Sequence, residues 1–269
     1  MRETALRFAA GLLGFLCVHQ AAEAQPVMSR CLAVAQDAAR VVPAAFIQAQ
    51  QLQADQVSIT YVGHSTFLIE SPAGTRIATD YNGFAGQGVV PDVVTMNHAH
   101  DSHYTEFPDS RITHVLRGWK EGSYAEHNLT VNDVFIRNVP TNIRSWAGGT
   151  EEFGNSVFIF EVSGLCIGHL GHLHHELTDQ QLGQIGQLDI VFVPVDGTYT
   201  LDHTGMRAVL KQLQARMIIP MHYFSTAGLA RFVASLGRDW PSRVNAGPSI
   251  VMSQATMPKT PELLILPPY

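Results

Sequence analysis

Apolar and polar residues alternate along much of the first half of the chain, in short runs that predict β-strands. The runs VSITYV and TFLIE have a period of two, and RIATD follows the turn signal SPAG. Further apolar runs bounded by polar or turn residues continue to residue 220. The strands predicted in this way comprise residues 57–62, 66–70, 76–80, 93–96, 112–116, 134–137, 157–162, 165–168, 190–195 and 217–220.

Three later segments carry apolar residues at a spacing of three to four, which predicts amphipathic helices. They comprise residues 178–185, with Thr178 as the N-cap, and residues 202–213 and 226–236. Strands therefore come first and alternate with helices later. We expect an α/β fold in which two sheets pack together with helices outside. No repeat, low-complexity tract or long linker interrupts residues 56–269, which are predicted to form one domain.

The first 24 residues have the pattern of a secretory signal peptide. Arg2 and Arg7 form a positive n-region, residues 8–18 form an apolar stretch of eleven, and residues 22–24 (AEA) form a cleavage site. Eleven residues fall short of the roughly 20 that a membrane-spanning helix requires. We expect cleavage after Ala24 and a periplasmic or secreted protein with no stable membrane anchor, and a retained anchor is the alternative.

Residues 25–55 are predicted as a helical extension, in which Ser29 caps a helix that ends before Pro43. This segment contains Cys31, and Cys166 lies in an apolar run of the main domain. In an oxidising compartment the two cysteines could pair, but a buried free thiol at Cys166 is an equal alternative. Because the chain has no Cys-x-x-Cys motif, zinc sites built on such cysteine pairs are excluded.

Composition indicates a globular protein. The chain has 269 residues, of which 46% are hydrophobic and 15% charged, so it has enough apolar material for a packed core. Its 17 Lys and Arg against 23 Asp and Glu give a net charge of −6, with no basic run. This balance argues against binding to nucleic acid or to anionic membranes. We therefore expect a small-molecule substrate.

Seven of the 13 histidines fall in two short windows, NHAHDSH at 97–103 and HLGHLHH at 169–175. The first window follows an apolar strand, and His98 and His100 leave its end on one side of the backbone because residues two apart share a face. His103 follows after a two-residue turn. A loop of this kind can direct three imidazoles to one point, and histidine is a common nitrogen ligand for divalent metals.

Two further strand ends carry histidine. The second window begins at the end of the predicted strand 165–168, so that His169 and His172 lie at or just past that end. His222 directly follows the apolar run MIIPM. Because α/β enzymes build their sites from the ends of several strands, histidines at three strand ends predict a metal site.

These motifs resemble those of the metallo-β-lactamase superfamily. The similarity is greatest to the branch that includes L-ascorbate-6-phosphate lactonase-like proteins and the phospholipase D acting on N-acyl-phosphatidylethanolamines. The resemblance implies a four-layer αβ/βα sandwich and a metal-dependent hydrolase. It rests on the order and content of residues 59–70, 98–103, 169–172, 193–197 and 219–223.

The metal motifs depart from the family pattern in three places. The family loop is His-x-His-x-Asp-His, and here Ser102 occupies the position of its second-metal Asp, with Asp101 one place early. His172 occupies the position of the metal-bridging Asp. Where the resemblance implies a further histidine after Val139-Pro140, the chain has none at 141–144.

The resemblance, with these departures, implies a ligand set of five histidines. His174 is an alternative ligand from the same loop as His172, and His64 is expected to orient a ligand or the substrate, or to be a packed turn residue. Because two carboxylates are replaced, one zinc ion is expected rather than two, with Fe, Ni or Cu as alternatives. The expected ligands are His98, His100, His103, His172 and His222.

In the expected hydrolase, a metal-bound hydroxide attacks an ester, lactone or phosphodiester. Asp101 is the candidate base, and Tyr223, with Tyr199 and Arg144 as further candidates, would stabilise developing negative charge. Asp196 is interpreted as a site residue or a turn former. Two other functions remain open. One is a catalytically degenerate metal-binding or sensing protein on the same fold, and the other is a redox site holding Fe or Cu.

Overall fold

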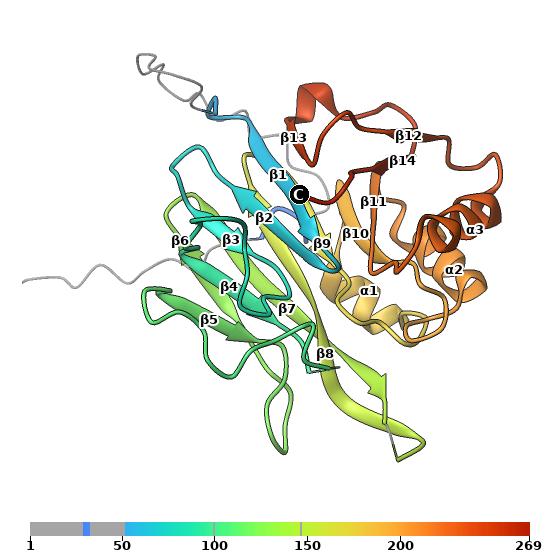
Figure 1. Cartoon of the computed structure of the whole chain (residues 1–269), viewed down its shortest axis with the longest axis horizontal. Helices are drawn as coiled ribbons and strands as arrows, with labels where there is room; N and C mark the ends of the chain where they lie inside the picture. Colours follow the sequence, from blue (N-terminus) through green and yellow to red (C-terminus); the bar gives the residue numbers. More distant parts are fainter. Residues whose placement is uncertain (1–28, 33–51, 99, 146) are drawn as a thin grey trace, which may run out of the picture.

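The computed structural model describes residues 29–32, 52–98, 100–145 and 147–269. Two sheets pack face to face in this part of the chain (Figure 1). The first sheet has six strands in the order β13-β1-β2-β3-β4-β5. Its strands are β1 (Val57–Gly63), β2 (Thr66–Glu70), β3 (Arg76–Ala78), β4 (Val93–Met96), β5 (His114–Arg117) and β13 (Ser249–Met252).

The second sheet has eight strands in the order β12-β14-β11-β10-β9-β8-β7-β6. Strands β6 to β9 form an antiparallel meander, and β9, β10, β11, β14 and β12 run parallel. Its strands are β6 (Asn128–Val131), β7 (Val134–Arg144), β8 (Thr150–Val162), β9 (Leu165–His169), β10 (Ile190–Pro194), β11 (Met217–Met221), β12 (Ser242–Val244) and β14 (Glu262–Ile265).

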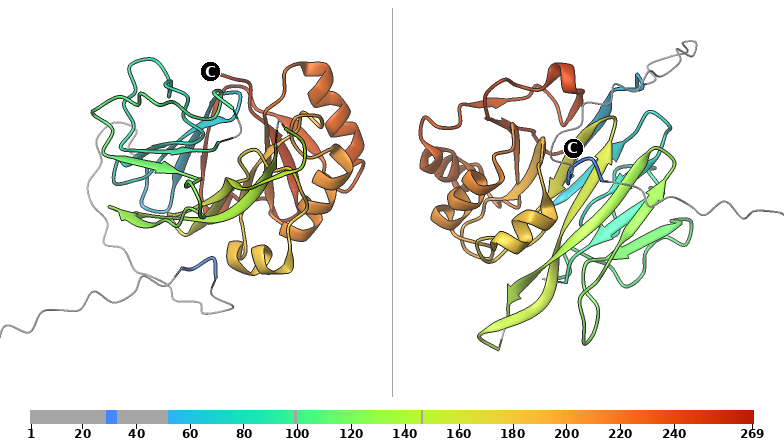
Figure 2. Two further views of the ribbon diagram at one scale, coloured as in Figure 1. Left: turned by 90° about the horizontal axis from the view of Figure 1, so that it is seen from below. Right: turned by 180° about the vertical axis from the view of Figure 1, so that it is seen from behind.

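Helices α1 (Asp179–Ile185), α2 (His203–Leu213) and α3 (Thr226–Leu236) cover the outer face of the eight-stranded sheet (Figures 1 and 2). The predicted capping of α1 is confirmed, since the Thr178 side chain accepts a hydrogen bond from the Gln181 N–H within a capping box. All three helices lie within a residue of their predicted bounds. Among the described residues, no helix is long and apolar enough to cross a membrane.

The main core lies between the two sheets. Alternate residues of β1 and β2 point inward and meet residues of the second sheet, and the rings of Phe67 and Phe192 stack with centroids 3.9 Å apart. Loops cover the outer face of β3 to β5, where Tyr81, Ala85 and Ile112 pack on Val94 and Met96. The structure thus confirms an α/β sandwich of the expected type, with loops on this face of the six-stranded sheet in the part of the chain that is described.

A disulfide joins the N-terminal segment to the body of the protein. Cys31 is bonded to Cys166 of β9, with Cα atoms 5.9 Å apart. Of the two alternatives from the sequence, the structure therefore has the paired cysteines and not a free thiol at Cys166. The main-chain N–H of Arg30 also donates to the Glu161 carboxylate at 2.8 Å. Residues 29–32 form a turn, and most of the predicted extension, residues 25–28 and 33–51, lies outside the described residues together with the predicted signal peptide.

Four strands were not predicted from the pattern: β14, which lies inside the eight-stranded sheet, and β6, β12 and β13, which lie at sheet edges. Strand β6 alternates between exposed and half-buried residues, and all three residues of β12 are exposed. Such strands lack the apolar runs that mark buried ones. The hairpin of β7 and β8 also extends past its predicted ends, to Arg144 and back to Thr150, where it borders the site described next.

Candidate metal site

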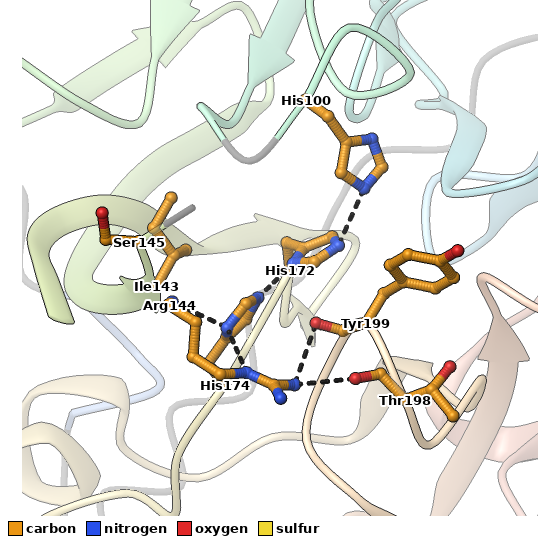
Figure 3. Close-up of a pocket in the computed structure, with 8 residues that line it drawn as sticks. All are labelled: His100, Ile143, Arg144, Ser145, His172, His174, Thr198 and Tyr199. Carbon is orange, nitrogen blue, oxygen red and sulfur yellow. Dashed lines mark hydrogen bonds between the residues drawn. The ribbon is translucent and has the colours of Figure 1, made fainter. Parts of the chain in front are cut away.

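A pocket of about 170 Å³ opens where the β7–β8 hairpin meets the loops that follow β4, β9 and β10 (Figure 3). Its wall combines imidazole, guanidinium, hydroxyl and aromatic groups, so it suits a small polar molecule. The lining residues are His100, Ile143, Arg144, Ser145, His172, His174, Thr198 and Tyr199.

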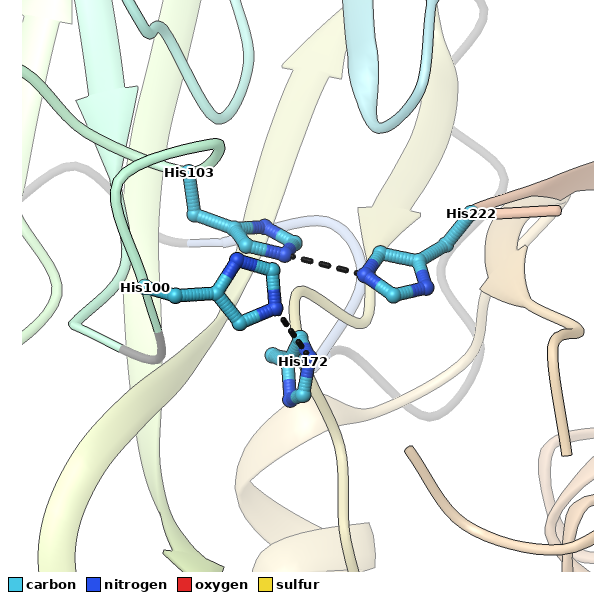
Figure 4. A group of neighbouring side chains, drawn as sticks. All are labelled: His100, His103, His172 and His222. Atoms are coloured by element: carbon cyan, nitrogen blue, oxygen red, sulfur yellow. Dashed lines mark hydrogen bonds between the residues drawn. The ribbon is translucent and has the colours of Figure 1, made fainter. Parts of the chain in front are cut away.

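Four imidazoles converge beside this pocket (Figure 4). Each imidazole contributes one ring nitrogen, and these four nitrogens all lie within 4.8 Å of one another. Two come from the loop after β4 in the six-stranded sheet, and the others follow β9 and β11 in the eight-stranded sheet. The cluster therefore lies between the two sheets, at the ends of their strands. It consists of His100, His103, His172 and His222.

Two buried carboxylates orient two of these rings. Nδ1 of His103 donates to Oδ2 of Asp80 at 2.7 Å, and Nδ1 of His222 donates to Oδ1 of Asp196 at 3.0 Å. Both carboxylates are almost fully buried, with side chains 0% and 1% exposed. Carboxylates in this position fix the orientation of a metal-binding imidazole and raise its basicity.

The other two rings have neutral partners. Nδ1 of His100 lies 2.6 Å from Oγ of Ser102, which also lies 2.9 Å from Nε2 of His64. Nδ1 of His172 is hydrogen-bonded to Nε2 of His174. In all four rings, therefore, Nδ1 is held by an outer partner and Nε2 points into the cluster.

The loop after β9 depends on a glycine to place His172. Gly171 has φ +58°, and a Cβ at this position would collide with the side chains of Asn97 and Asn155. Oδ1 of Asn155 accepts the N–H of His172 at 2.8 Å, and its Nδ2 donates to the carbonyl of Leu170 at 3.1 Å. A residue without a Cβ is therefore required where the chain turns from the strand into the cluster.

Two histidines adopt left-handed backbone conformations where the sheets meet. His222 has φ 54° and His64 has φ 52°. The His222 N–H donates to the His64 carbonyl at 2.7 Å, which ties the end of β11 to the β1–β2 turn. Such conformations cost roughly 1–2 kcal/mol each in a residue with a Cβ. Their occurrence beside the cluster is typical of a functional site.

Burial lowers the pKa of three of the cluster imidazoles. It lowers the pKa of His100 to about 4, with further lowering by the neighbouring His103 and His222 rings. Burial also lowers the pKa of His172 and, despite the Asp196 carboxylate, that of His222. Because a metal binds neutral imidazole, these groups do not have to release a proton at neutral pH before binding.

The two carboxylates remain charged. Burial alone would raise the pKa of Asp80, but the neighbouring His169 and His103 hold it below its usual value. For Asp196 the effect of burial is likewise outweighed, because His222 and Thr200 donate hydrogen bonds to the carboxylate. Two negative charges beside the imidazole cluster match the charge of one divalent cation.

The distances within the cluster also fit a metal ion. Nε2 of His100 lies 2.9 Å from Nε2 of His172, and Nε2 of His103 lies 3.1 Å from Nε2 of His222. For comparison, nitrogens bound to one tetrahedral zinc lie about 3.3 Å apart, given Zn–N bonds of roughly 2.0–2.1 Å. Since His103 and His222 both donate through Nδ1 to carboxylates, both Nε2 atoms present lone pairs, which repel each other unless a cation lies between them.

The structure brings four of the five predicted ligands together and leaves His98 outside. Nδ1 of His98 lies 2.9 Å from Oε1 of Glu151, and its ring stacks on Trp119 at 5.1 Å. The prediction assumed that the alternation of the strand continued past its end. Instead, β4 ends at Met96, and the side chain of Asn97 turns inward to Asp80, 2.8 Å away.

Neither predicted catalytic residue reaches the cluster. Asp101 is exposed on the loop between His100 and His103, because the one-residue shift turns it to the opposite side. The hydroxyl of Tyr223 donates to the carbonyl of Leu266 at 3.5 Å, and its ring packs against both apolar cores. The left-handed turn at His222 directs the next side chain into the core and away from the pocket.

The structure also places three further residues singled out from the sequence, and it does not bring His174, the alternative ligand, into the cluster. His64 orients a cluster ring through Ser102, and His174 partners His172 in place of binding in the cluster. Asp196 has both of the roles considered for it, since it also accepts the N–H groups of residues 198–200 in a turn. The sequence reasoning missed Asp80, the last residue of the predicted strand 76–80, which in the structure lies two residues after the end of β3.

Comparisons with known proteins agree with this geometry. Residues 58–222 match the family model described as the beta-lactamase superfamily domain. A metal-dependent hydrolase of Methanospirillum hungatei is 25% identical over 203 residues, covering 68% of this chain and 90% of the relative. Another from Thermococcus kodakarensis is 24% identical over 197 residues, covering 62% and 84%.

Solved structures show the same fold. A Thermotoga maritima protein described as a Zn-dependent hydrolase of the metallo-β-lactamase superfamily has a TM-score of 0.57 and 29% identity, covering 78% of this chain and 98% of that one. The metallo hydrolase Igni18 from Ignicoccus hospitalis has a TM-score of 0.51 and 20% identity, covering 74% and 99%.

Proposed function

The chain belongs to the beta-lactamase superfamily, and from this membership and the imidazole cluster we propose that it is a hydrolase that depends on one zinc ion. The proposed substrates are small molecules with an ester, lactone or phosphodiester bond. The observation that supports the proposal best is the convergence of four Nε2 atoms whose Nδ1 atoms are all held by outer partners.

A bound zinc ion would lower the pKa of a water ligand and polarise the scissile carbonyl or phosphoryl oxygen. The pocket supplies the remaining groups. The Arg144 guanidinium lies in its wall, held by Nη2 bonds to the carbonyls of Thr198, Tyr199 and Thr200 at 2.9, 3.0 and 2.6 Å. A guanidinium fixed in this way can bind a negatively charged group of the substrate without losing side-chain freedom.

A single metal is proposed because the groups near a second position are engaged elsewhere. Ser102 is hydrogen-bonded to His100 and His64, and His98 to Glu151. Oδ1 of Asn142, in the segment where a further histidine would be expected, accepts the N–H of Phe153 at 3.0 Å.

A catalytically degenerate metal-binding protein is the second candidate. The number of imidazoles supports it, because four protein ligands would close a tetrahedral site, as in structural zinc sites. The pocket beside His100 and His172 supports the hydrolase, since it gives a small molecule access to the cluster. Turnover distinguishes the two candidates.

We also propose a periplasmic or secreted location. The pattern of residues 1–24 is that of a signal peptide. The disulfide between Cys31 and Cys166 supports the same location, because disulfides persist mainly in oxidising compartments.

The test begins with elemental analysis of the protein purified from the periplasm. The wild type should contain about one zinc per chain, and the double variant His103→Ala/His222→Ala should contain none. His114→Ala, which alters a histidine of β5 outside the cluster, is the matched control and should retain the metal. The zinc-loaded protein is then screened against lactones, phosphodiesters and carboxylic esters. Zinc content without turnover would favour the degenerate protein, and no zinc above that of the double variant would contradict both candidates.

A further inference from the structure

Hydrogen bonds between the hairpin and the cluster determine which nitrogen of each ring carries a proton (Figure 3). The main-chain N–H and the Nε–H of Arg144 both donate to Nδ1 of His174, at 2.7 and 3.1 Å. Because an amide and a guanidinium can only donate, Nδ1 of His174 must carry a lone pair. His174 is therefore neutral, and its single ring proton is on Nε2.

The same reasoning extends from His174 into the cluster. Nε2–H of His174 donates to Nδ1 of His172, which leaves the proton of His172 on Nε2. This Nε2–H faces Nε2 of His100 at 2.9 Å, so that atom accepts, and Nδ1–H of His100 donates to Ser102 at 2.6 Å. Each ring stays neutral along this chain, and only the position of its proton is determined.

The other half of the cluster has a different arrangement. His103 and His222 donate through Nδ1 to carboxylates, so their Nε2 atoms carry lone pairs. The cluster thus has Nε2 lone pairs on His103, His222 and His100, and one N–H, on His172, which the His100 lone pair accepts in the structure. A metal bound to His100 would take that lone pair and release the N–H of His172. We infer that three histidines hold the metal and that His172 is a hydrogen-bond donor to the substrate, an inference that rests on the proposed function.

This assignment resolves the difficulty of a closed site. Catalytic zinc sites keep three protein ligands and one open position, whereas four protein ligands close the site. His172 and His100 both line the pocket, so the N–H of His172, once released from His100, would lie close to the space where a substrate enters. There it can donate to the carbonyl or phosphoryl oxygen on which negative charge develops. His174 acts through His172 and is a positioning residue, and Arg144 has the same role through its bonds to His174, in addition to the substrate-binding role proposed for its guanidinium.

The tautomer of His172 depends partly on a main-chain hydrogen bond. One of the two donors to His174 is the main-chain N–H of Arg144, at the end of β7, and it does not depend on the side chain. The side chain adds bonds to three carbonyls of the loop after β10. Two loops and a hairpin therefore keep a proton on Nε2 of His172.

Matched glutamine variants test the inference through zinc binding, measured by competition with a chromophoric chelator. The glutamine amide nitrogen is the same number of bonds from Cα as Nε2 of histidine, but it carries N–H and no lone pair for a metal. We expect His172→Gln to bind zinc within about threefold of the wild type. His103→Gln should weaken binding by about a hundredfold or more, beyond the usual effect of an outer partner. Equal losses in both variants would overturn the inference, whereas a wild type that binds no zinc would overturn the proposed function instead.

A second measurement begins with the wild type, so its main result does not depend on any variant folding. Long-range ¹H–¹⁵N NMR spectra of zinc-loaded wild-type protein should show His172 with a proton on Nε2 and none on Nδ1. His174→Gln keeps an N–H of similar reach and should leave this tautomer unchanged. His174→Leu removes the donor, so His172 can present a lone pair, and X-ray absorption should then show four nitrogen ligands from histidine in place of three. A deprotonated Nε2 of His172 in the zinc-loaded wild type would refute the assignment.

Discussion

Substitution of Asp80 by asparagine isolates the contribution of a buried charge to the metal site. In the structure, Oδ2 accepts the Nδ1–H of His103 at 2.7 Å and Oδ1 accepts the Nδ2–H of Asn97 at 2.8 Å. Asp80→Asn keeps the shape of the side chain but replaces one oxygen by NH₂. That NH₂ must face a donor, whichever way the new amide is oriented.

The expected loss follows from these contacts. If the new NH₂ faces His103, Nδ1 can accept only when the ring proton moves to Nε2, which removes a lone pair from the cluster. If it faces Asn97, a buried donor loses its partner at a cost of about 1–3 kcal/mol. Loss of an outer partner typically weakens metal affinity by about 10–100-fold, or roughly 1.4–2.7 kcal/mol. We therefore expect Asp80→Asn to weaken zinc binding by about that factor.

The assay is chelator competition at pH 7.5, with urea unfolding of the metal-free protein as a check that the variant folds. Asp101→Asn is the matched control, because it removes the same charge from an exposed residue between two of the cluster histidines. It should leave zinc affinity within about twofold, since exposed charges are screened by solvent. The reasoning would be refuted if Asp80→Asn bound zinc as tightly as the wild type, or if Asp101→Asn weakened binding equally.

Three further predictions concern stability, each measured by urea unfolding. Gly171→Ala places a Cβ at φ +58° against two buried asparagine side chains. It should therefore destabilise the protein by more than the roughly 1–2 kcal/mol that the left-handed conformation alone costs. An unchanged urea midpoint would contradict this and show that the loop can relax. The variant Cys31→Ser/Cys166→Ser removes a link between residues 135 apart and should lower the free energy of unfolding by about 2–5 kcal/mol. A reducing agent should then destabilise only the wild type. An equal loss of stability in the double variant would argue against a role for the disulfide. Burial lowers the pKa of His64 to about 3 and also lowers that of His172. Below about pH 6.5, therefore, the unfolded chain binds protons at these two histidines while the folded protein does not, which favours unfolding. Stability without metal should therefore be full above that pH and fall between pH 6.5 and 5, and a midpoint that does not change with pH would contradict this.

Much of the fold could be predicted from the sequence because its elements are encoded locally. Alternating and continuous apolar runs marked β1, β2 and β4 within a residue of their ends, and the Thr178 N-cap and apolar spacing marked the bounds of α1. Exposed strands such as β6 and β12 lacked this signal, since their pairing depends on neighbours distant in the sequence.

The candidate site was predictable to the extent that strand ends determine it. Histidines placed directly after apolar strands indicated a metal site, and the superfamily prediction from the same motifs is confirmed by the family match. The identification as a metal-dependent hydrolase agrees with the names of the relatives. Local patterns suffice here because a strand delivers its last residues to a definite edge of its sheet.

Tertiary structure decided which histidines meet and what surrounds them. His98 and His103 belong to the same window, yet only His103 reaches the cluster, because Asp80 from another strand binds its ring. The position of the proton on His172 depends on Arg144, a residue of a different hairpin. Sequence spacing can place a residue at a strand end, but the direction of a hydrogen bond and the partner of a buried charge are set by contacts between segments that come together only when the sheets pack.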